Sequence, residues 1–178
     1  IEDIKQFYFK RDGPKLQNNG FPWPRFQAEI TDETTSRQLQ YLHKNGCYKA
    51  FKRGLIKITY APKEDRVLFH TQDRKGAVGR RLGKYGPKWM SYGDTSMGIL
   101  VGTGNTLVIV EDAASACSVS RLHNVAGFAL LGTKLKKSYI NLLNTYQYKL
   151  MCLDKDASKQ ALSLSRELGE SCKVKLIK

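Results

Sequence analysis

The sequence contains no apolar run long enough to cross a membrane. Apolar stretches such as residues 107–110 and 126–131 fall far short of the ~18 residues that a membrane-spanning helix needs. The first residues also lack the apolar segment of a secretion signal, because Glu2, Asp3 and Lys5 interrupt it. We therefore expect neither a membrane protein nor a secreted one, and no membrane partner.

Cysteine pairs of the kind that bind zinc are absent as well. The cysteines at positions 47, 117, 152 and 172 stand far apart, and none belongs to a Cys-x-x-Cys pair. Structural zinc sites usually draw their ligands from such pairs, so we expect no zinc and reduced thiols in a cytoplasmic protein. The stretch Gly102-Thr103-Gly104-Asn105 lacks the lysine of a Walker-type loop, which excludes that kind of phosphate site.

Acidic residues are scarce. The chain has 30 Lys and Arg against 16 Asp and Glu, a formal net charge of +14. The excess is concentrated between His43 and Lys88, where 13 basic residues stand against 3 acidic ones. Aromatic side chains accompany this basic segment, namely Tyr48, Tyr60, Tyr85, Trp89 and Tyr92. The mixture suits phosphate contacts together with base stacking, although a solubilising basic face with core aromatics would give the same pattern.

The first half of the chain divides into two parts. Residues 1–33 are expected to form an irregular strap packed on the body, because Pro22 and Pro24 prevent a regular helix or a central strand. Residues 34–93 are expected to form a small basic α+β subdomain. Its helix follows Thr34 or Thr35 and stops at Gly46, alternation at 56–60 indicates a strand, and strands at 66–71 and 77–82 flank a hairpin turn.

Residues 94–178 have a different sequence pattern, which indicates short apolar strands that alternate with helices. We expect strands at 107–110, 127–131, 149–153 and 172–177, and helices at 112–123, 136–146 and 156–169. Such alternation is typical of βαβ units and predicts an α/β fold with a parallel sheet and flanking helices.

Carboxylates follow two of these strands. Glu111 comes directly after the strand at 107–110, and Asp154 and Asp156 follow the strand at 149–153. Parallel sheets place ligands at the carboxyl ends of their strands, and clustered acids in a basic protein are costly unless a cation neutralises them. Oxygen ligands suit Mg²⁺ or Mn²⁺. The alternative is that Asp154 or Asp156 merely caps the following helix.

These residues resemble a known family. Val110-Glu111 after one strand, Leu131-Gly132-Thr133 after the next and Leu153-Asp154-Lys155-Asp156 after the third are similar to the Toprim domain, the metal-binding module of primases, some topoisomerases and some nucleases. Upstream, Gly79-Arg80 and Pro87-Lys88-Trp89-Met90 resemble the segment that precedes Toprim in bacterial-type primases. The resemblance covers residues 35–178 and is strongest to small phage-encoded versions, so the domain at 94–178 is expected to be Toprim-like.

The resemblance implies roles for individual residues. Glu111, Asp154 and Asp156 match the family's ligands for divalent ions, which implies two Mg²⁺ or Mn²⁺ ions. Glu111, Lys88 and Arg80 are the expected catalytic residues. Nucleic acid or nucleoside triphosphate is expected to bind the basic segment, at Arg80, Arg81, Lys84, Lys88 and Trp89.

Several features depart from the family's pattern. Asp112 stands where most members have glycine, and no second lysine follows soon after Pro87-Lys88. No cysteine-rich module precedes the domain, no Walker-type loop follows it, and the family's third acidic motif would fall beyond Lys178. We therefore expect a catalytic core without zinc-binding or helicase domains.

The function implied by the resemblance is the synthesis of short RNA primers on single-stranded DNA from nucleoside triphosphates, with a replicative helicase as partner. A phage-encoded version would work in the cytoplasm of a bacterial host cell. Two alternatives stay open at this point. A Toprim nuclease would use the same acids with water as nucleophile, and an inactive nucleic-acid-binding module would fit the missing second lysine.

Overall fold

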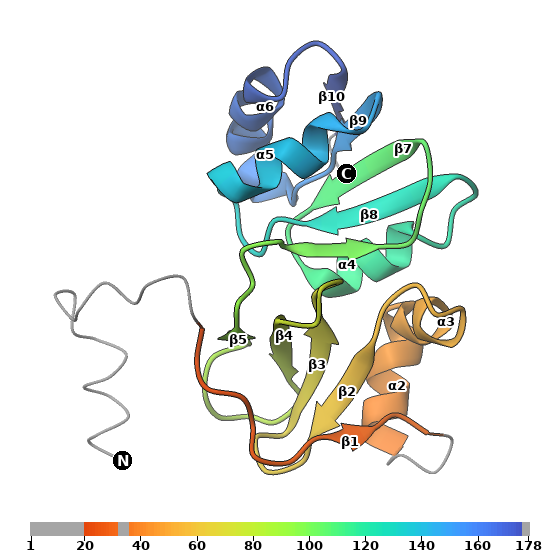
Figure 1. Ribbon diagram of the computed structural model, residues 1–178, viewed down its shortest axis with the longest axis vertical. Helices are drawn as coiled ribbons and strands as arrows, with labels where there is room; N and C mark the ends of the chain where they lie inside the picture. The colour runs from red at the N-terminus through yellow and green to blue at the C-terminus, as the bar shows by residue number, and fades with distance from the viewer. Residues whose placement is uncertain (1–19, 32–35, 176–178) are drawn as a thin grey trace, which may run out of the picture.

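The computed structural model describes residues 20–31 and 36–175, which form two five-stranded sheets lying one above the other (Figure 1). The first sheet comes from the first half of the chain and the second sheet from the second half. This mixed α/β architecture confirms the fold class expected from the sequence.

The first sheet is antiparallel throughout, and its strands lie in chain order. They are β1 (Ala28–Glu29), β2 (Ile58–Ala61), β3 (Arg66–His70), β4 (Gly76–Arg81) and β5 (Trp89–Gly93). β3 and β4 form the expected hairpin, whose turn is closed by the Thr71 hydroxyl. That hydroxyl donates to the Asp73 carboxylate at 2.6 Å and accepts from the Gly76 backbone N–H at 3.1 Å. β5 was not among the predicted strands, because Ser91 and Gly93 weaken its apolar alternation.

Two helices cover one face of this sheet. α2 (Ser36–Lys44) ends where the sequence predicted, and Gly46 then turns the chain at φ 70°, in the left-handed region that favours glycine. A second helix that the sequence did not suggest, α3 (Cys47–Lys52), follows at once. The expected capping residues Thr34 and Thr35 lie outside the described residues.

The opposite face is crossed by residues 20–31 (Figure 1). At one edge, the Phe21 N–H donates to the Ser91 carbonyl of β5 at 2.9 Å. At the other edge β1 pairs with β2, so this segment contains a short strand rather than being wholly irregular. Between the two edges the Trp23 ring stacks on His70, with centroids 5.6 Å apart. Positions 1–19 and 32–33 of the predicted strap lie outside the described residues.

The second sheet has the strand order β10-β9-β7-β8-β6. Its strands are β6 (Ile99–Val101), β7 (Thr106–Val110), β8 (Val125–Ala129), β9 (Tyr148–Met151) and β10 (Cys172–Val174). β7, β8, β9 and β10 pair in parallel, as expected, whereas β6 adds an unpredicted antiparallel strand at the edge beside β8. β8 ends two residues earlier than predicted, and Leu131 beyond it has φ 59°, outside the extended region.

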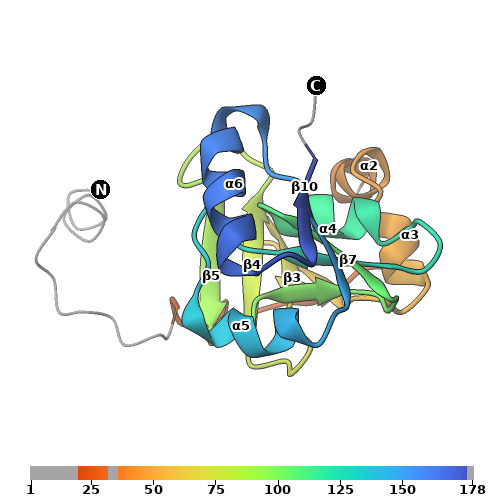
Figure 2. The same cartoon turned by 90° about the horizontal axis from the view of Figure 1, so that it is seen from above.

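Helices cover both faces of the second sheet, as Figures 1 and 2 show. α4 (Ala113–Val119) packs on the face that carries Val108 and Val110. α5 (Lys137–Asn144) and α6 (Ser158–Glu167) pack on the opposite face, which carries Leu107 and Ile109. A single 3-10 turn, η1 (Lys155–Ala157), precedes α6. The alternation of side chains along β7 therefore fills two separate apolar cores.

One of these cores joins the two halves of the chain. It contains Leu42 of α2 and Phe69 of β3 from the first half, together with Val108 of β7 and Cys117 of α4 from the second. This shared packing fixes the position of one sheet against the other.

No helix among the described residues has the length and apolar character needed to cross a membrane.

Candidate metal centre and nucleotide cavity

Three carboxylates meet at one edge of the second sheet. Glu111 directly follows β7, while Asp154 and Asp156 follow β9. β7 and β9 are parallel neighbours with Ile109 opposite Met151, so their carboxyl ends lie side by side. One carboxylate oxygen from each of the three acids lies within 4.8 Å of the others. The arrangement follows directly from the parallel pairing predicted by the sequence.

The electrostatics of Glu111 show how concentrated the negative charge is. Partial burial raises the pKa of this carboxyl, and the charges of Asp154, Asp156 and Asp112 raise it further. A backbone hydrogen bond works against the shift, because the Asp154 N–H donates to Glu111 Oε1 at 3.2 Å. A divalent cation at this point would remove the repulsion, and oxygen donors are the ligands that Mg²⁺ and Mn²⁺ prefer. The three acids therefore fit such an ion.

The helix-capping alternative is not what the structure shows for Asp154 and Asp156. Asp154 stands immediately before η1, but its side chain makes no capping hydrogen bond, and Asp156 lies inside that turn. The residue that precedes α6 is Ala157. Asp112 is the acid that does cap a helix, since its carboxylate accepts from the Ser115 N–H of α4 at 2.9 Å. The carboxylates of Asp154 and Asp156 are both exposed and face Glu111.

A cavity of about 370 Å³ separates these acids from the first sheet. Glu111, Asp112 and Asp154 line one wall, and the chain beyond β8 contributes Leu131 and Gly132. The opposite wall belongs to the first sheet and is lined by Val78, Lys88, Trp89, Met90 and Ser91. The cavity thus has an acidic wall from one half of the chain and a wall carrying a lysine from the other.

A second cavity, of about 310 Å³, lies beside the first and shares Lys88, Trp89 and Asp112 with it. Arg80 lines this cavity, with its guanidinium carbon 5.6 Å from the centre of the Trp89 ring and 5.8 Å from that of Tyr41. Burial raises the pKa of Tyr41, so its hydroxyl stays neutral. A guanidinium beside two aromatic rings is restricted in position, which suits it to hold a phosphate.

The predicted nucleic-acid residues do not all lie together. Arg80, Lys88 and Trp89 line the cavities, whereas Arg81 and Lys84 are not among the lining residues. Arg81 follows Arg80 on β4 and therefore points to the other face of the sheet, where its guanidinium donates to the Gly86 carbonyl. Lys84 is exposed in the connection between β4 and β5.

Sequence reasoning missed several residues that line these cavities. Tyr41 and Lys44 come from α2, and Ser115 and Ser118 come from α4. No motif marks them, because only the packing of these two helices against the shared core brings them to the same place. Gly132 was part of the Leu131-Gly132-Thr133 motif, but its position on a cavity wall was not predicted.

Comparison with known proteins gives structural matches only. No protein-family model and no curated protein matches the sequence. Among solved structures, the chain superposes on the Aquifex aeolicus primase (zinc-binding and RNA polymerase domains) with a TM-score of 0.51 and 19% identity. That match covers 84% of this chain and 43% of the other.

A second structure, described as the DnaG catalytic core, matches with a TM-score of 0.59 and 17% identity. The match covers 84% of this chain and 67% of the DnaG catalytic core structure. This chain is therefore shorter than either matched structure and spans less than half the length of the Aquifex protein. At this level of identity the likeness concerns the fold, and on that evidence the chain has the fold of the DnaG primase catalytic core.

Proposed function

We propose that this chain is a metal-dependent nucleotidyltransferase that makes short RNA primers on single-stranded DNA. The observation that carries the proposal is the cavity in which Glu111 and Asp154 face Lys88, within a chain that has the primase-core fold. Nucleoside triphosphates and single-stranded DNA are the corresponding partners. A replicative helicase as a further partner stays a prediction.

The residues divide the chemistry between them. Glu111, Asp154 and Asp156 would hold Mg²⁺ or Mn²⁺, which in such sites brings a 3′-hydroxyl and a triphosphate together and offsets the charge of the reacting phosphate. Lys88 places a positive charge on the opposite wall of the same cavity. Arg80, restricted by Tyr41 and Trp89, adds a second cation in the adjoining cavity. Positioned cations of this kind stabilise negative charge that develops on transferred phosphates.

Primer synthesis tests the proposal directly. The protein is incubated with single-stranded DNA, labelled ribonucleotides and Mn²⁺, and the products are separated by length. We expect template-dependent RNA products from the parent and none from an Asp154→Asn variant purified in parallel, which controls for contaminating polymerases. A matched Glu170→Gln variant should keep the activity, because Glu170 precedes β10 at the amino ends of the parallel strands.

The same assay separates the competing functions. If labelled DNA is shortened in the absence of ribonucleotides and Asp154→Asn abolishes this cleavage, the protein is a nuclease and the proposal is wrong. If the protein binds single-stranded DNA but neither makes primers nor cleaves the DNA, it is a catalytically inactive nucleic-acid-binding module.

A further inference from the structure

The connection between β4 and β5, residues 82–88, is held in place by its own hydrogen bonds. The backbone N–H of Arg81 donates to the Lys88 carbonyl at 3.0 Å, and the Arg81 guanidinium donates to the Gly86 carbonyl. Glycines stand at positions 83 and 86 of this connection. A side chain at Gly83 would meet the Asp65 carboxylate at 2.7 Å, and Gly86 has φ 88°. We call residues 82–88 the β4–β5 tip.

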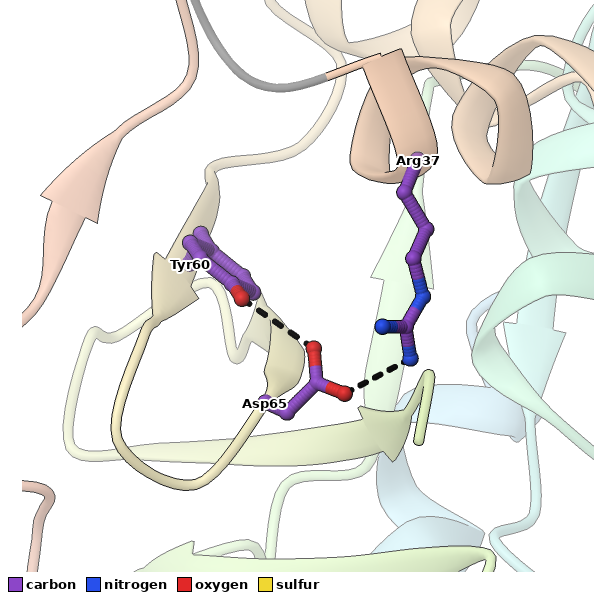
Figure 3. Close-up of polar contacts among 3 residues, drawn as sticks. All are labelled: Arg37, Tyr60 and Asp65. Carbon is purple, nitrogen blue, oxygen red and sulfur yellow. Dashed lines mark hydrogen bonds and ion pairs between the residues drawn. The ribbon is translucent and has the colours of Figure 1, made fainter. Parts of the chain in front are cut away.

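The base of the β4–β5 tip is anchored to three other elements. The Leu82 N–H donates to the Asp65 carbonyl at 2.9 Å. The carboxylate of Asp65 in turn accepts from the Tyr60 hydroxyl of β2 at 3.1 Å and from Arg37 Nη2 of α2 at 2.7 Å (Figure 3). Through Asp65, the β4–β5 tip is therefore connected by hydrogen bonds to α2, to β2 and to the segment before β3.

A buried arginine supports the other side of the tip. Arg66 of β3 is 4% exposed, and its guanidinium donates to the Gly79 carbonyl of β4 at 3.0 Å and to the Pro87 carbonyl at 2.7 Å. It therefore links β4 to the residue that precedes Lys88, and Lys88 lines the cavity of the metal centre. The tip is a fixed extension of that cavity wall.

Tyr85 projects from this fixed tip and is 90% exposed. The other four aromatics associated with the basic segment are already engaged. Tyr92 is buried, Tyr60 binds Asp65, and Trp89 packs between Phe69 and Arg80. The fourth, Tyr48, is covered on its ring by His43 and Lys52. Of these five aromatic side chains, Tyr85 is the one that is almost fully exposed to solvent.

The charge around Tyr85 identifies the kind of molecule that would use it. Six basic residues and no acidic residue occur between positions 74 and 93. Lys84 is adjacent to Tyr85 and exposed, and Lys88 is exposed at the end of the tip. The carboxylate of Asp65, which lies beside Gly83 of the tip, is paired with Arg37. An exposed aromatic ring between cations matches a nucleic-acid strand with an unpaired base beside its phosphates.

We propose that Tyr85 stacks on an unpaired base of single-stranded DNA and guides the strand toward the cavity lined by Lys88. The inference rests on the proposed function, because it identifies how the template is held. It does not depend on catalysis, so binding measured without metal tests it separately from primer synthesis.

The experiment compares variants by fluorescence anisotropy with a labelled oligothymidylate in metal-free buffer. Tyr85→Ala should weaken binding by about 5-fold to 100-fold, the range expected when one base–aromatic stack is removed. Tyr85→Phe should bind within about twofold of the parent, because stacking needs the ring and not the hydroxyl. The slope of log affinity against log salt should be unchanged in both variants, because every cation that binds a phosphate is still present.

A matched control and a modified probe sharpen the result. Tyr148 at the start of β9 is also exposed, and Tyr148→Ala should bind as the parent does because it lies at the amino ends of the parallel strands. On a fully abasic strand, the parent should bind no better than Tyr85→Ala. Unchanged thermal unfolding of Tyr85→Ala confirms that its fold is intact.

Three outcomes would overturn the inference, namely equal binding by Tyr85→Ala and the parent, an equal loss in Tyr85→Phe, or no binding of single strands by the parent at all. Normal binding and stacking without primer synthesis would instead overturn the proposed function and leave this inference standing.

Discussion

The acidic cluster predicts that adding metal will reverse the order of stability of the parent and an Asp156→Asn variant. Asp156→Asn removes one charge and keeps the size of the side chain. In the parent, the Asp156 carboxylate lies within 4.8 Å of those of Glu111 and Asp154. At this separation two unit charges repel by about 1 kcal/mol in water, so removing both repulsions should raise the free energy of unfolding by about 1–2 kcal/mol without metal. For a chain of this size that corresponds to a rise of about 2–8 °C in Tm.

Saturating Mn²⁺ should reverse this order. A ligand at 100 times its Kd stabilises the native state by about 2.7 kcal/mol, and the parent should gain an increment of this size. Asp156→Asn should gain much less, because one of the three ligands is an uncharged amide. The parent is then the more stable protein in Mn²⁺ and the less stable one in EDTA.

Thermal unfolding of both proteins in EDTA and across a Mn²⁺ titration measures the effect. Glu170→Gln is the matched control, since it removes one exposed carboxylate at the amino ends of the parallel strands, and its response to Mn²⁺ should equal that of the parent. Equal Mn²⁺ stabilisation of the parent and Asp156→Asn would refute the metal site. A lower Tm of Asp156→Asn in EDTA would show that the three carboxylates do not repel one another in the native state.

Three further results are expected. Lys88→Ala should lower primer synthesis by about 10²-fold or more, because a fixed cation opposite the acids is removed, whereas the affinity for single-stranded DNA should stay nearly unchanged. A primer yield within about twofold of the parent would show that Lys88 is an ordinary surface lysine. Replacing Lys44 and Lys84 by Gln should make the slope of log affinity against log salt concentration less negative by about 1.4, or about 0.7 for each phosphate that is no longer neutralised. An unchanged slope would show that the DNA strand binds away from these two lysines. Burial lowers the pKa of His70 from 6.5 to about 4, so the unfolded chain binds the proton more tightly than the native state and stability should decrease as pH falls from 6.5 to 4. Chemical denaturation at both pH values should show a loss of up to about 3 kcal/mol, which a His70→Gln variant should lack.

Much of the second sheet and the acidic cluster was predictable because both follow from one regularity. Short apolar strands alternating with helices indicate parallel pairing, and parallel pairing brings Glu111 and Asp154 to the same edge. β6 was missed because its three residues carry no period, and its place is set by pairing with β8. The capping alternative for Asp154 could not be decided from the sequence either, since the same residue type serves as cap and as ligand.

The residues that complete the cavities lay beyond sequence reasoning for a different reason. Tyr41 lies beside Arg80 only because α2 packs on the face of the first sheet that carries Arg80. Similarly, Arg80 and Arg81 are consecutive basic residues in the sequence, yet the strand sends one into a cavity and the other to the opposite face. A count of charges locates a basic segment, and the pleat of the strand decides which of its charges line the cavity beside the metal centre.

Residues 20–31 have a consequence for the solubility of the molecule. Open strand edges are templates for pairing with other chains, and both edges of the first sheet are occupied in part by this one segment, at β5 through Phe21 and at β2 through β1. Pro22 and Pro24 have no N–H to offer to a further strand along the stretch between those two pairings. The segment therefore covers part of each edge of the sheet, and shortening the chain to the region around the metal centre would open both edges further to self-association.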